Sequence, residues 1–246
     1  MDKNVRTHDL LYLLENRYEK PKQLHLEIIE LIADFFETNE ILRSATILDA
    51  GCAAGEFAYQ IHKSFPAFKT SAFDLLPVLV DKARQNVPGV NFFEADILDK
   101  SSVEPNYADI VTCSGVLSIF DDFTHPLNNL ISWVKPKGKL FLHSLFSEYP
   151  FDVRVRYNAS QDYGKGILET GWNIFSKTTM SNYLTILQEK RVIKNFLFHD
   201  FHLRVHLERQ PDMIRSWTFE DASGRNVLTN GLMILQPHAI LEVTKA

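Results

Sequence analysis

The residues with the clearest chemical meaning lie in one short segment, ATILDAGCAAGEF, at positions 45–57. A short apolar run ends in the carboxylate of Asp49, and a loop of small residues from Gly51 to Gly55 follows at once. Residues of this size leave the backbone bare, so that another molecule can lie close to it. An acid beside a bare loop therefore indicates a ligand-binding turn.

Two phosphate-binding loops fit this segment poorly. A dinucleotide fingerprint needs glycine at its first, third and sixth positions, and counting from Gly51 the chain has Ala53 third and Glu56 sixth. Glu56 would place a carboxylate where a pyrophosphate approaches the start of a helix. A P-loop would need Gly-Lys-Ser or Gly-Lys-Thr, which does not follow. The loop favours a ligand without phosphates and is compatible with a positively charged one.

The elements that must position this loop alternate regularly along the chain. Short apolar runs predict strands at 46–50, 70–75, 90–96, 108–115 and 139–146, and the intervening patterns predict helices at 56–65, 77–86 and 126–134. Strands that alternate with helices are typical of parallel βαβ units. The sequence therefore predicts a doubly wound α/β sheet, whose ligands bind beyond the carboxyl ends of the strands.

The flanking segments follow other patterns. Helical spacing predicts a helix over 22–38 and a short one near 9–17. Residues 147–177 show no clear period, and a helix is expected over 178–190 with Ser176 or Thr178 as its N-cap. Two β-like runs, 192–207 and 231–245, enclose the segment 208–226, which we interpret as an insertion too polar to be core.

The segment ILDAGCAAGEFA resembles the first motif of class I S-adenosylmethionine-dependent methyltransferases, which reads acid-x-Gly-x-Gly-x-Gly. Asp49, Gly51 and Gly55 match, while Ala53 replaces the middle glycine. The similarity covers about residues 40–146 and continues in outline through the last two strands. It implies a seven-stranded, mostly parallel sheet with an antiparallel last strand, an N-terminal helical lid and an insertion after the fifth strand. It also implies S-adenosylmethionine as cofactor and S-adenosylhomocysteine as product.

The resemblance extends to residues at later strand ends. Asp74, 19 residues after Gly55, matches the acid that binds both ribose hydroxyls, and Asp96 matches the acid that meets the adenine amino group. The full cofactor set that the resemblance implies is Asp49, Gly51, Cys52, Ala53, Gly55, Asp74, Leu75, Asp96, Ile97, Ser114 and Gly115. Structural roles stay open for the acids: Asp49 as a loop cap, Asp74 as a helix-start residue, and Glu94 or Asp99 in place of Asp96.

The methyl acceptor must be held by segments that lie over the cofactor. His143 ends the fifth strand, where a neutral imidazole could take a proton from a hydroxyl or amine, although a buried core histidine is an equal alternative. Arg154–Tyr157, read as RVRY, is interpreted either as an anion clamp or as an exposed alternating strand. The substrate-side candidates are Tyr18, Tyr149, Arg154, Arg156, Tyr157 and Trp172, with Tyr12, Arg17 and Tyr163 as further aromatic and basic residues of the same segments.

Composition sets outer limits on function. The chain has 246 residues and a formal net charge of −5, which argues against nucleic acid as a partner, since phosphate binding favours a basic surface. Its two cysteines, Cys52 and Cys113, lack metal-type spacing, so no metal site is expected. No uncharged run approaches the roughly 20 apolar residues that span a bilayer, so we expect no membrane association and a cytoplasmic protein.

These observations predict one methyltransferase domain over 1–246 that acts on a small-molecule acceptor by O- or N-methylation. Within it we expect a lid at 1–44, a cofactor-binding core at 45–146, a substrate-side insertion at 147–177, and a C-terminal helix with the last two strands at 178–246. An acidic or sugar-like intermediate suits the RVRY segment. The alternatives are a non-catalytic adenosylmethionine-binding module and, less favoured because of Glu56, an NAD-dependent oxidoreductase.

Overall fold

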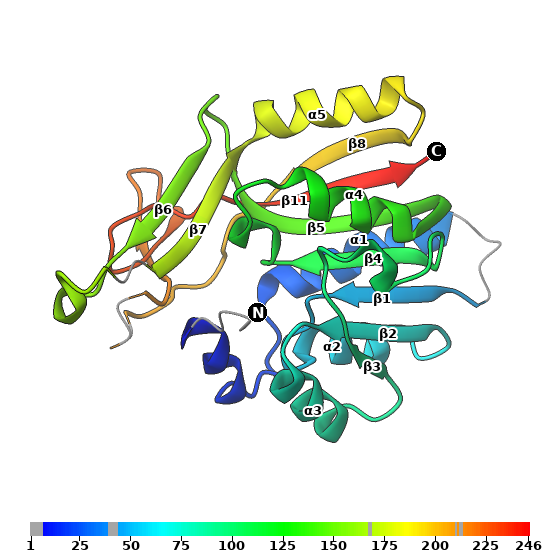
Figure 1. Ribbon diagram of the computed structural model, residues 1–246, viewed down its shortest axis with the longest axis horizontal. Helices are drawn as coiled ribbons and strands as arrows, with labels where there is room; N and C mark the ends of the chain where they lie inside the picture. Colours follow the sequence, from blue (N-terminus) through cyan, green and yellow to red (C-terminus); the bar gives the residue numbers. More distant parts are fainter. Residues whose placement is uncertain (1–6, 39–43, 167–168, 210, 212–213) are drawn as a thin grey trace.

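The computed structural model describes residues 7–38, 44–166, 169–209, 211 and 214–246. Within these residues a central path of seven strands runs in the order β3-β2-β1-β4-β5-β11-β8 (Figure 1). Its strands are β1 (Thr46–Ala50), β2 (Lys69–Asp74), β3 (Asn91–Glu94), β4 (Ala108–Ser114), β5 (Val134–Ser147), β8 (Ile193–Asp200) and β11 (His238–Lys245).

The direction of the strands agrees with the predicted sheet. The pairs from β3 through β5 are parallel, whereas β11 runs antiparallel to both β5 and β8. The chain order reverses between β1 and β4, so the loops after these two strands diverge to opposite sides. In an open α/β sheet this divergence leaves room for a ligand.

Helices cover both faces of the sheet because successive side chains of each buried strand point to opposite faces. α1 (Gln23–Thr38), α2 (Glu56–Ser64) and α3 (Pro77–Asn86) pack on one face, where α1 lies behind the sheet in Figure 1. α4 (Thr124–Trp133) and α5 (Lys177–Glu189) pack on the other. Short 3-10 turns complete the helical elements: η1 (Thr7–Leu13), η2 (Lys100–Ser102), η3 (Leu117–Ile119) and η4 (Ser160–Asp162).

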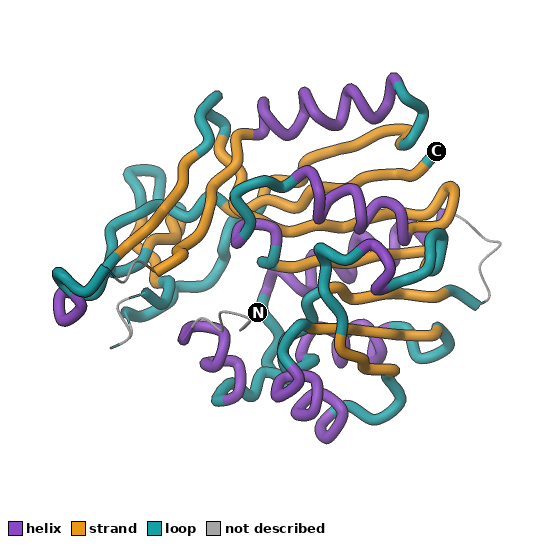
Figure 2. Tube along the Cα trace, in the orientation of Figure 1, coloured by secondary structure: helices purple, strands orange, loops and turns teal. Residues whose placement is uncertain are grey.

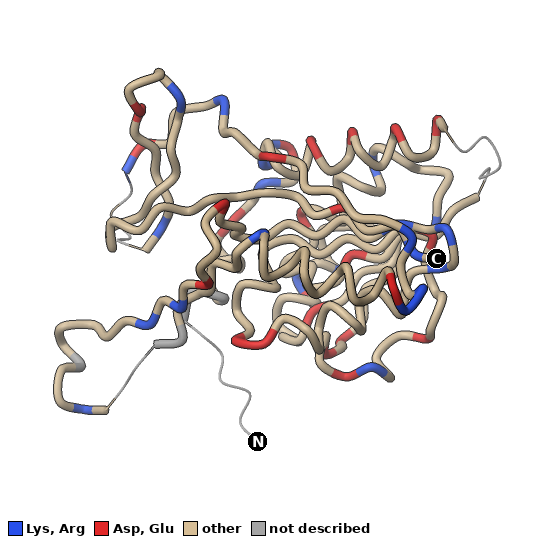
Figure 3. The backbone as a smooth tube through the Cα atoms, turned by 90° about the horizontal axis from the view of Figure 1, so that it is seen from above, with Lys and Arg blue, Asp and Glu red and all other residues tan. Residues whose placement is uncertain are grey.

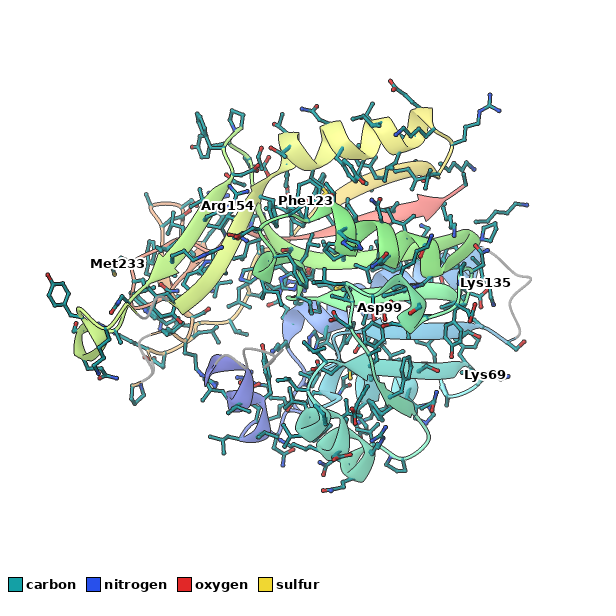
Figure 4. All side chains as sticks on the ribbon, in the orientation of Figure 1. Lys69, Asp99, Phe123, Lys135, Arg154 and Met233 are labelled. Atoms are coloured by element: carbon teal, nitrogen blue, oxygen red, sulfur yellow. The ribbon has the colours of Figure 1, made fainter. Side chains whose placement is uncertain are left out.

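Two hairpins extend from the carboxyl side of the strands. β6 (Val153–Tyr157) pairs with β7 (Glu169–Ser176), and β9 (Trp217–Glu220) pairs with β10 (Asn226–Thr229) (Figure 2). Figure 4 labels Lys69 and Lys135 at the amino-terminal ends of strands, and Arg154 and Met233 on the opposite side, with the hairpins.

Several boundaries differ from those expected. The segment 147–177, which shows no clear period, forms β6 and β7, and the polar insertion at 208–226 contains β9 with Thr218 2% exposed. Polar strands of this kind are stabilised by pairing in a hairpin, which hydrophobic periodicity does not detect. The β-like runs 192–207 and 231–245 shorten to β8 and β11, and the link after β3 contains η2.

The ends of the helices follow local signals. Ser176 is the N-cap of α5, because its hydroxyl accepts a hydrogen bond from the backbone N–H of Thr178 at 3.0 Å. The short helix expected near 9–17 is the 3-10 turn η1. The expected lid at 1–44 falls partly outside the described residues. None of the helices described is long and apolar enough to cross a bilayer.

Candidate functional site

A cavity of about 770 Å³ lies at the carboxyl ends of β1, β2, β4 and β5. Ten of the eleven residues expected to bind the cofactor line it: Asp49, Gly51, Cys52, Ala53, Asp74, Leu75, Asp96, Ile97, Ser114 and Gly115. Gly55 is the exception. A Cβ at Gly55 would come within 2.9 Å of Ala83 and Phe92, so this glycine permits the close packing of the first turn of α2.

The bare loop between β1 and α2 keeps its shape through three left-handed residues, Gly51, Ala53 and Gly55. Gly51 has a φ of +78°, and a Cβ there would lie 2.4 Å from a methyl group of Val116. Ala53, which replaces the middle glycine of the motif, also has a positive φ, 47°. Its N–H donates to Asp74 Oδ2 at 2.9 Å, and this bond compensates for the strained conformation.

Asp49 is buried at the end of β1 with only one of its carboxylate oxygens satisfied. Oδ1 accepts a hydrogen bond from the Thr112 hydroxyl at 2.8 Å, whereas Oδ2 has no partner among the described residues. The pKa of Asp49 is raised to about 7. Burial is the main cause, the Thr112 hydrogen bond opposes it, and the charge of Asp74 adds to it. An unpartnered buried carboxylate oxygen in the cavity wall suits a cationic ligand.

Asp74 and Asp96 are oriented by backbone N–H groups at the ends of β2 and β3. Asp74 Oδ1 accepts from Leu76 N–H at 3.0 Å, while its Oδ2 accepts from Ala53 N–H. Asp96 Oδ1 accepts from Leu98 N–H at 2.9 Å. The two carboxylates that could replace Asp96 lie elsewhere: Glu94 does not line the cavity, and Asp99 caps η2.

Three histidines line the other part of the cavity. His143, 7% exposed, has both ring nitrogens engaged: Nδ1 lies 3.1 Å from Ser114 Oγ, and Nε2 lies 2.6 Å from His238 Nδ1. His238 stacks on His143 with ring centroids 4.9 Å apart. His25 stacks on Phe57 at 4.3 Å.

The pKa values of these histidines are all lowered, first by burial and then by positive charge. Burial and Lys22 lower the pKa of His238 to about 4. The pKa of His143 is held well below its usual value by burial, by its two histidine neighbours and by Lys22, and that of His25 by burial, Lys22 and Arg17. Neutral imidazoles are therefore the resting forms at neutral pH.

The expected substrate-side residues separate into two groups. Tyr157 and Trp172 line the cavity, as do Tyr12 and Arg17. The others do not: Tyr18 donates from its hydroxyl to the Ala54 carbonyl at 2.7 Å and supports the glycine loop, and Tyr149 and Tyr163 are 74% and 90% exposed.

The RVRY segment contributes Tyr157 but neither of its arginines to the cavity lining. Arg154 and Arg156 lie outside the cavity lining, and both guanidinium groups face Asp121. Arg156 also contacts the side-chain oxygen of Asn173 on β7. Asp121 belongs to the loop that precedes α4. The two arginines therefore connect the β6–β7 hairpin to that loop.

Sequence reasoning missed five charged or titratable residues that line the cavity: Glu15, Lys22, His25, Arg215 and His238. His238 begins β11, two residues before Ile240, which pairs with His143 across the sheet. Only the register of β5 with β11 brings these two histidines together. Lys22 and His25 arrive with the first turn of α1, and Arg215 with the segment before β9.

Glu56 bears on the choice of cofactor. Its carboxylate lines the cavity at the start of α2 and accepts a hydrogen bond from the Arg17 N–H at 2.6 Å. A carboxylate at a helix start disfavours a pyrophosphate in the same place. The Glu56 carboxylate, the unpartnered oxygen of Asp49 and the open space beside Gly115 together fit a cationic adenosyl ligand without phosphates.

Comparisons with known proteins agree with this geometry. A family model described as a methyltransferase domain matches residues 21–185. The malonyl-[acyl-carrier protein] O-methyltransferase of Halalkalibacterium halodurans is 34% identical over 159 residues, 59% of each chain. The ubiquinone biosynthesis O-methyltransferase of Xanthomonas euvesicatoria is 30% identical over 116 residues, 46% of this chain and 48% of the relative. The chain thus spans about half the length of these curated relatives.

Solved structures resemble the fold as a whole. The putative methyltransferase in a complex with the Haloferax volcanii Trm112 methyltransferase activator has a TM-score of 0.59 and 14% identity, covering 98% of this chain and 99% of the other. This likeness supports the fold alone. The family model, which matches more than half of the chain, establishes membership: the chain belongs to the methyltransferase domain family.

Proposed function

We propose that the protein is an O-methyltransferase with a small-molecule acceptor. The observation that carries the proposal is the single cavity that joins the glycine loop and Asp49 to His143 and His238. Two relatives are named as O-methyltransferases, which favours oxygen as the methylated atom. Tyr157 and Trp172 wall the acceptor side with aromatic surface, as is common in sites for small organic molecules.

The bound cofactor supplies an activated methyl group on a sulfonium cation. The protein has to align the acceptor with this group and keep water out, so positioning contributes much of the rate. In this proposal Asp49 binds the cationic part of the cofactor, Asp74 its ribose hydroxyls and Asp96 its adenine amino group. Their position in the cavity lining and the open space at Gly115 support these roles.

A hydroxyl acceptor also needs a group that removes its proton, and the histidine pair provides one. In one tautomer, His143 Nδ1–H donates to Ser114 Oγ, and His238 Nδ1–H donates to His143 Nε2. His238 Nε2 then keeps a free lone pair, and no described residue is hydrogen-bonded to it. We assign the general base to His238, with His143 as the residue that orients it. The sequence had suggested His143 itself as the base.

The proposal is tested by measuring release of S-adenosylhomocysteine with a panel of hydroxyl- and carboxyl-bearing small molecules. His238→Ala should lower turnover on a hydroxyl acceptor by about 10²–10⁴-fold, the usual contribution of a general base. His202→Ala, a histidine outside the cavity lining, is the matched control and should leave turnover unchanged. A protein that binds the cofactor but turns over no acceptor would instead support the non-catalytic binding module.

A further inference from the structure

Lys22 is a cation in the cavity wall without a counter-ion. It lies directly before α1, and its Nζ stands 5.5 Å from the ring centroid of Tyr12. Among the residues that the structure describes, no carboxylate lies within ion-pair distance of Nζ. A lysine that faces a cavity in this way leaves its charge available to a ligand.

His25 is a second unsatisfied group in the same turn. Its side chain is 7% exposed and lines the cavity, yet its ring nitrogens have no hydrogen-bond partner in the described part of the chain. These nitrogens are not among the fully buried atoms that lack a partner, so they are open to the cavity, where a ligand can hydrogen-bond to them. The first turn of α1 adds N–H groups that lack intrahelical acceptors and favour negative charge.

The charges that act on the three histidines are positive. Lys22 acts on His25, His143 and His238, Arg17 acts on His25, and no carboxylate contributes to any of the three pKa values. Glu15, a carboxylate in the cavity lining, pairs with two cations, with Arg215 at 3.0 Å and Arg17 at 3.3 Å. Figure 3 shows Lys and Arg interspersed with Asp and Glu along the backbone.

We propose that the methyl acceptor is a small carboxylic acid whose carboxylate binds between Lys22 Nζ and His25, at the N-terminus of α1. The inference rests on the proposed function, and it names the acceptor's chemical class and its docking group. The hydroxyl or second carboxylate to be methylated then points toward His238 and the cofactor. Arg17 and Arg215, which share Glu15, form the outer wall of the same site.

The docked carboxylate also changes the histidines. Its negative charge offsets the field of Lys22, so the pKa of His238 rises from about 4 toward its ordinary value. A stronger base is thereby formed only when the acceptor is in place. The free enzyme keeps its histidines neutral, and the acceptor itself supplies the charge that makes proton removal easier.

Binding is tested by calorimetry on protein saturated with S-adenosylhomocysteine, with succinate and tricarballylate as probes, succinamide as the neutral match and inorganic phosphate as the other anion. Carboxylates should bind and succinamide should not. Lys22→Met should weaken carboxylate binding about 10- to 100-fold, as expected for a charge-assisted contact. Lys20→Met, an exposed lysine two residues away, should have no effect. Equal binding of succinate and succinamide, no loss in Lys22→Met, or binding of phosphate alone would overturn the proposal.

A second measurement needs no turnover. Histidine titration by NMR should show the pKa of His238 rising in Lys22→Met, and rising in the native protein when succinate saturates it. His25→Phe, which preserves stacking on Phe57, should weaken succinate without changing S-adenosylhomocysteine affinity. If succinate leaves all three histidine titrations unchanged, the carboxylate does not bind here. Failure to bind S-adenosylhomocysteine would count against the proposed function instead, since that binding is measured separately.

Discussion

Replacing Asp49 with Asn should make the free protein more stable at pH 8 and, at the same pH, weaken cofactor binding. Burial raises the pKa of Asp49 to about 7 in the free protein, far above the 3.8 of an exposed aspartate. The folded state therefore holds a proton that the unfolded state loses, so this contribution to stability is complete below pH 3.8 and is lost as the pH rises through 7. At about 1.4 kcal/mol for each pKa unit, the loss is on the order of 4 kcal/mol.

Asp49→Asn removes this dependence. An asparagine oxygen can still accept the Thr112 hydrogen bond, while its buried amide nitrogen costs about 1–3 kcal/mol if it finds no acceptor. We therefore expect the free variant to be more stable than the native protein at pH 8 by about 1–3 kcal/mol, and no more stable at pH 4. Urea unfolding at both pH values measures this difference.

Cofactor binding should change in the opposite direction. A cationic amino group binds the ionised form of Asp49, so native affinity for S-adenosylhomocysteine should fall about tenfold between pH 8 and pH 6 as the carboxylate takes up its proton. Asp49→Asn should bind more weakly at pH 8 and show no such slope. Calorimetry in buffers of different ionisation enthalpy would also detect the proton released by the native protein. A native affinity that is flat between pH 6 and 8 would refute this account of Asp49.

Three further predictions follow from the same site. Asp74→Ala should weaken S-adenosylhomocysteine binding about tenfold or more in calorimetry, and should also lower the melting temperature, because the N–H groups of Ala53 and Leu76 lose their acceptor. With the protein saturated in S-adenosylmethionine, so that the ionisation of Asp49 does not enter, kcat/KM for the acceptor should stay flat as the pH falls through 6.5, because the pKa of His238 is about 4; a decline centred at 6.5 would contradict the lowered value. Gly51→Ala should destabilise the protein by about 1–3 kcal/mol in urea unfolding, since its Cβ would meet Val116 at a positive φ.

The cofactor half of the site was predictable because its signals are local. Asp49, Asp74 and Asp96 each end an apolar run, and parallel strands bring such ends to one edge of a sheet. Small residues in the loop, above all Gly51, indicate from the sequence alone that another group lies close to the backbone. Neither observation requires knowledge of how distant segments pack.

The acceptor half was not predictable in the same way. His238 reaches His143 only through the register of two antiparallel strands that lie 95 residues apart in the chain. Lys22 lines the cavity because α1 packs on the sheet. Hydrophobic spacing predicts the helix, but it does not predict which of its residues lie next to the ligand. The alternating RVRY pattern is compatible with an anion clamp at Arg156. The pattern carries no information about Asp121, the carboxylate with which this arginine forms an ion pair.

The two hairpins shape one wall of the cavity from outside the seven-strand path. The β6–β7 hairpin lies off the seven-strand path and the β9–β10 hairpin forms a sheet of its own, so the ladders of β5 with β11 and of β11 with β8 continue without them. Trp172 on β7 and Leu228 on β10 contribute cavity wall from these additions, while the loop after β1 belongs to the sheet itself. For protein engineering, the hairpins are therefore the segments to exchange when an acceptor of different shape but with the same docking carboxylate is wanted. A library limited to them would vary the outer wall of the cavity and leave Lys22, His25, His238 and the cofactor loop unchanged.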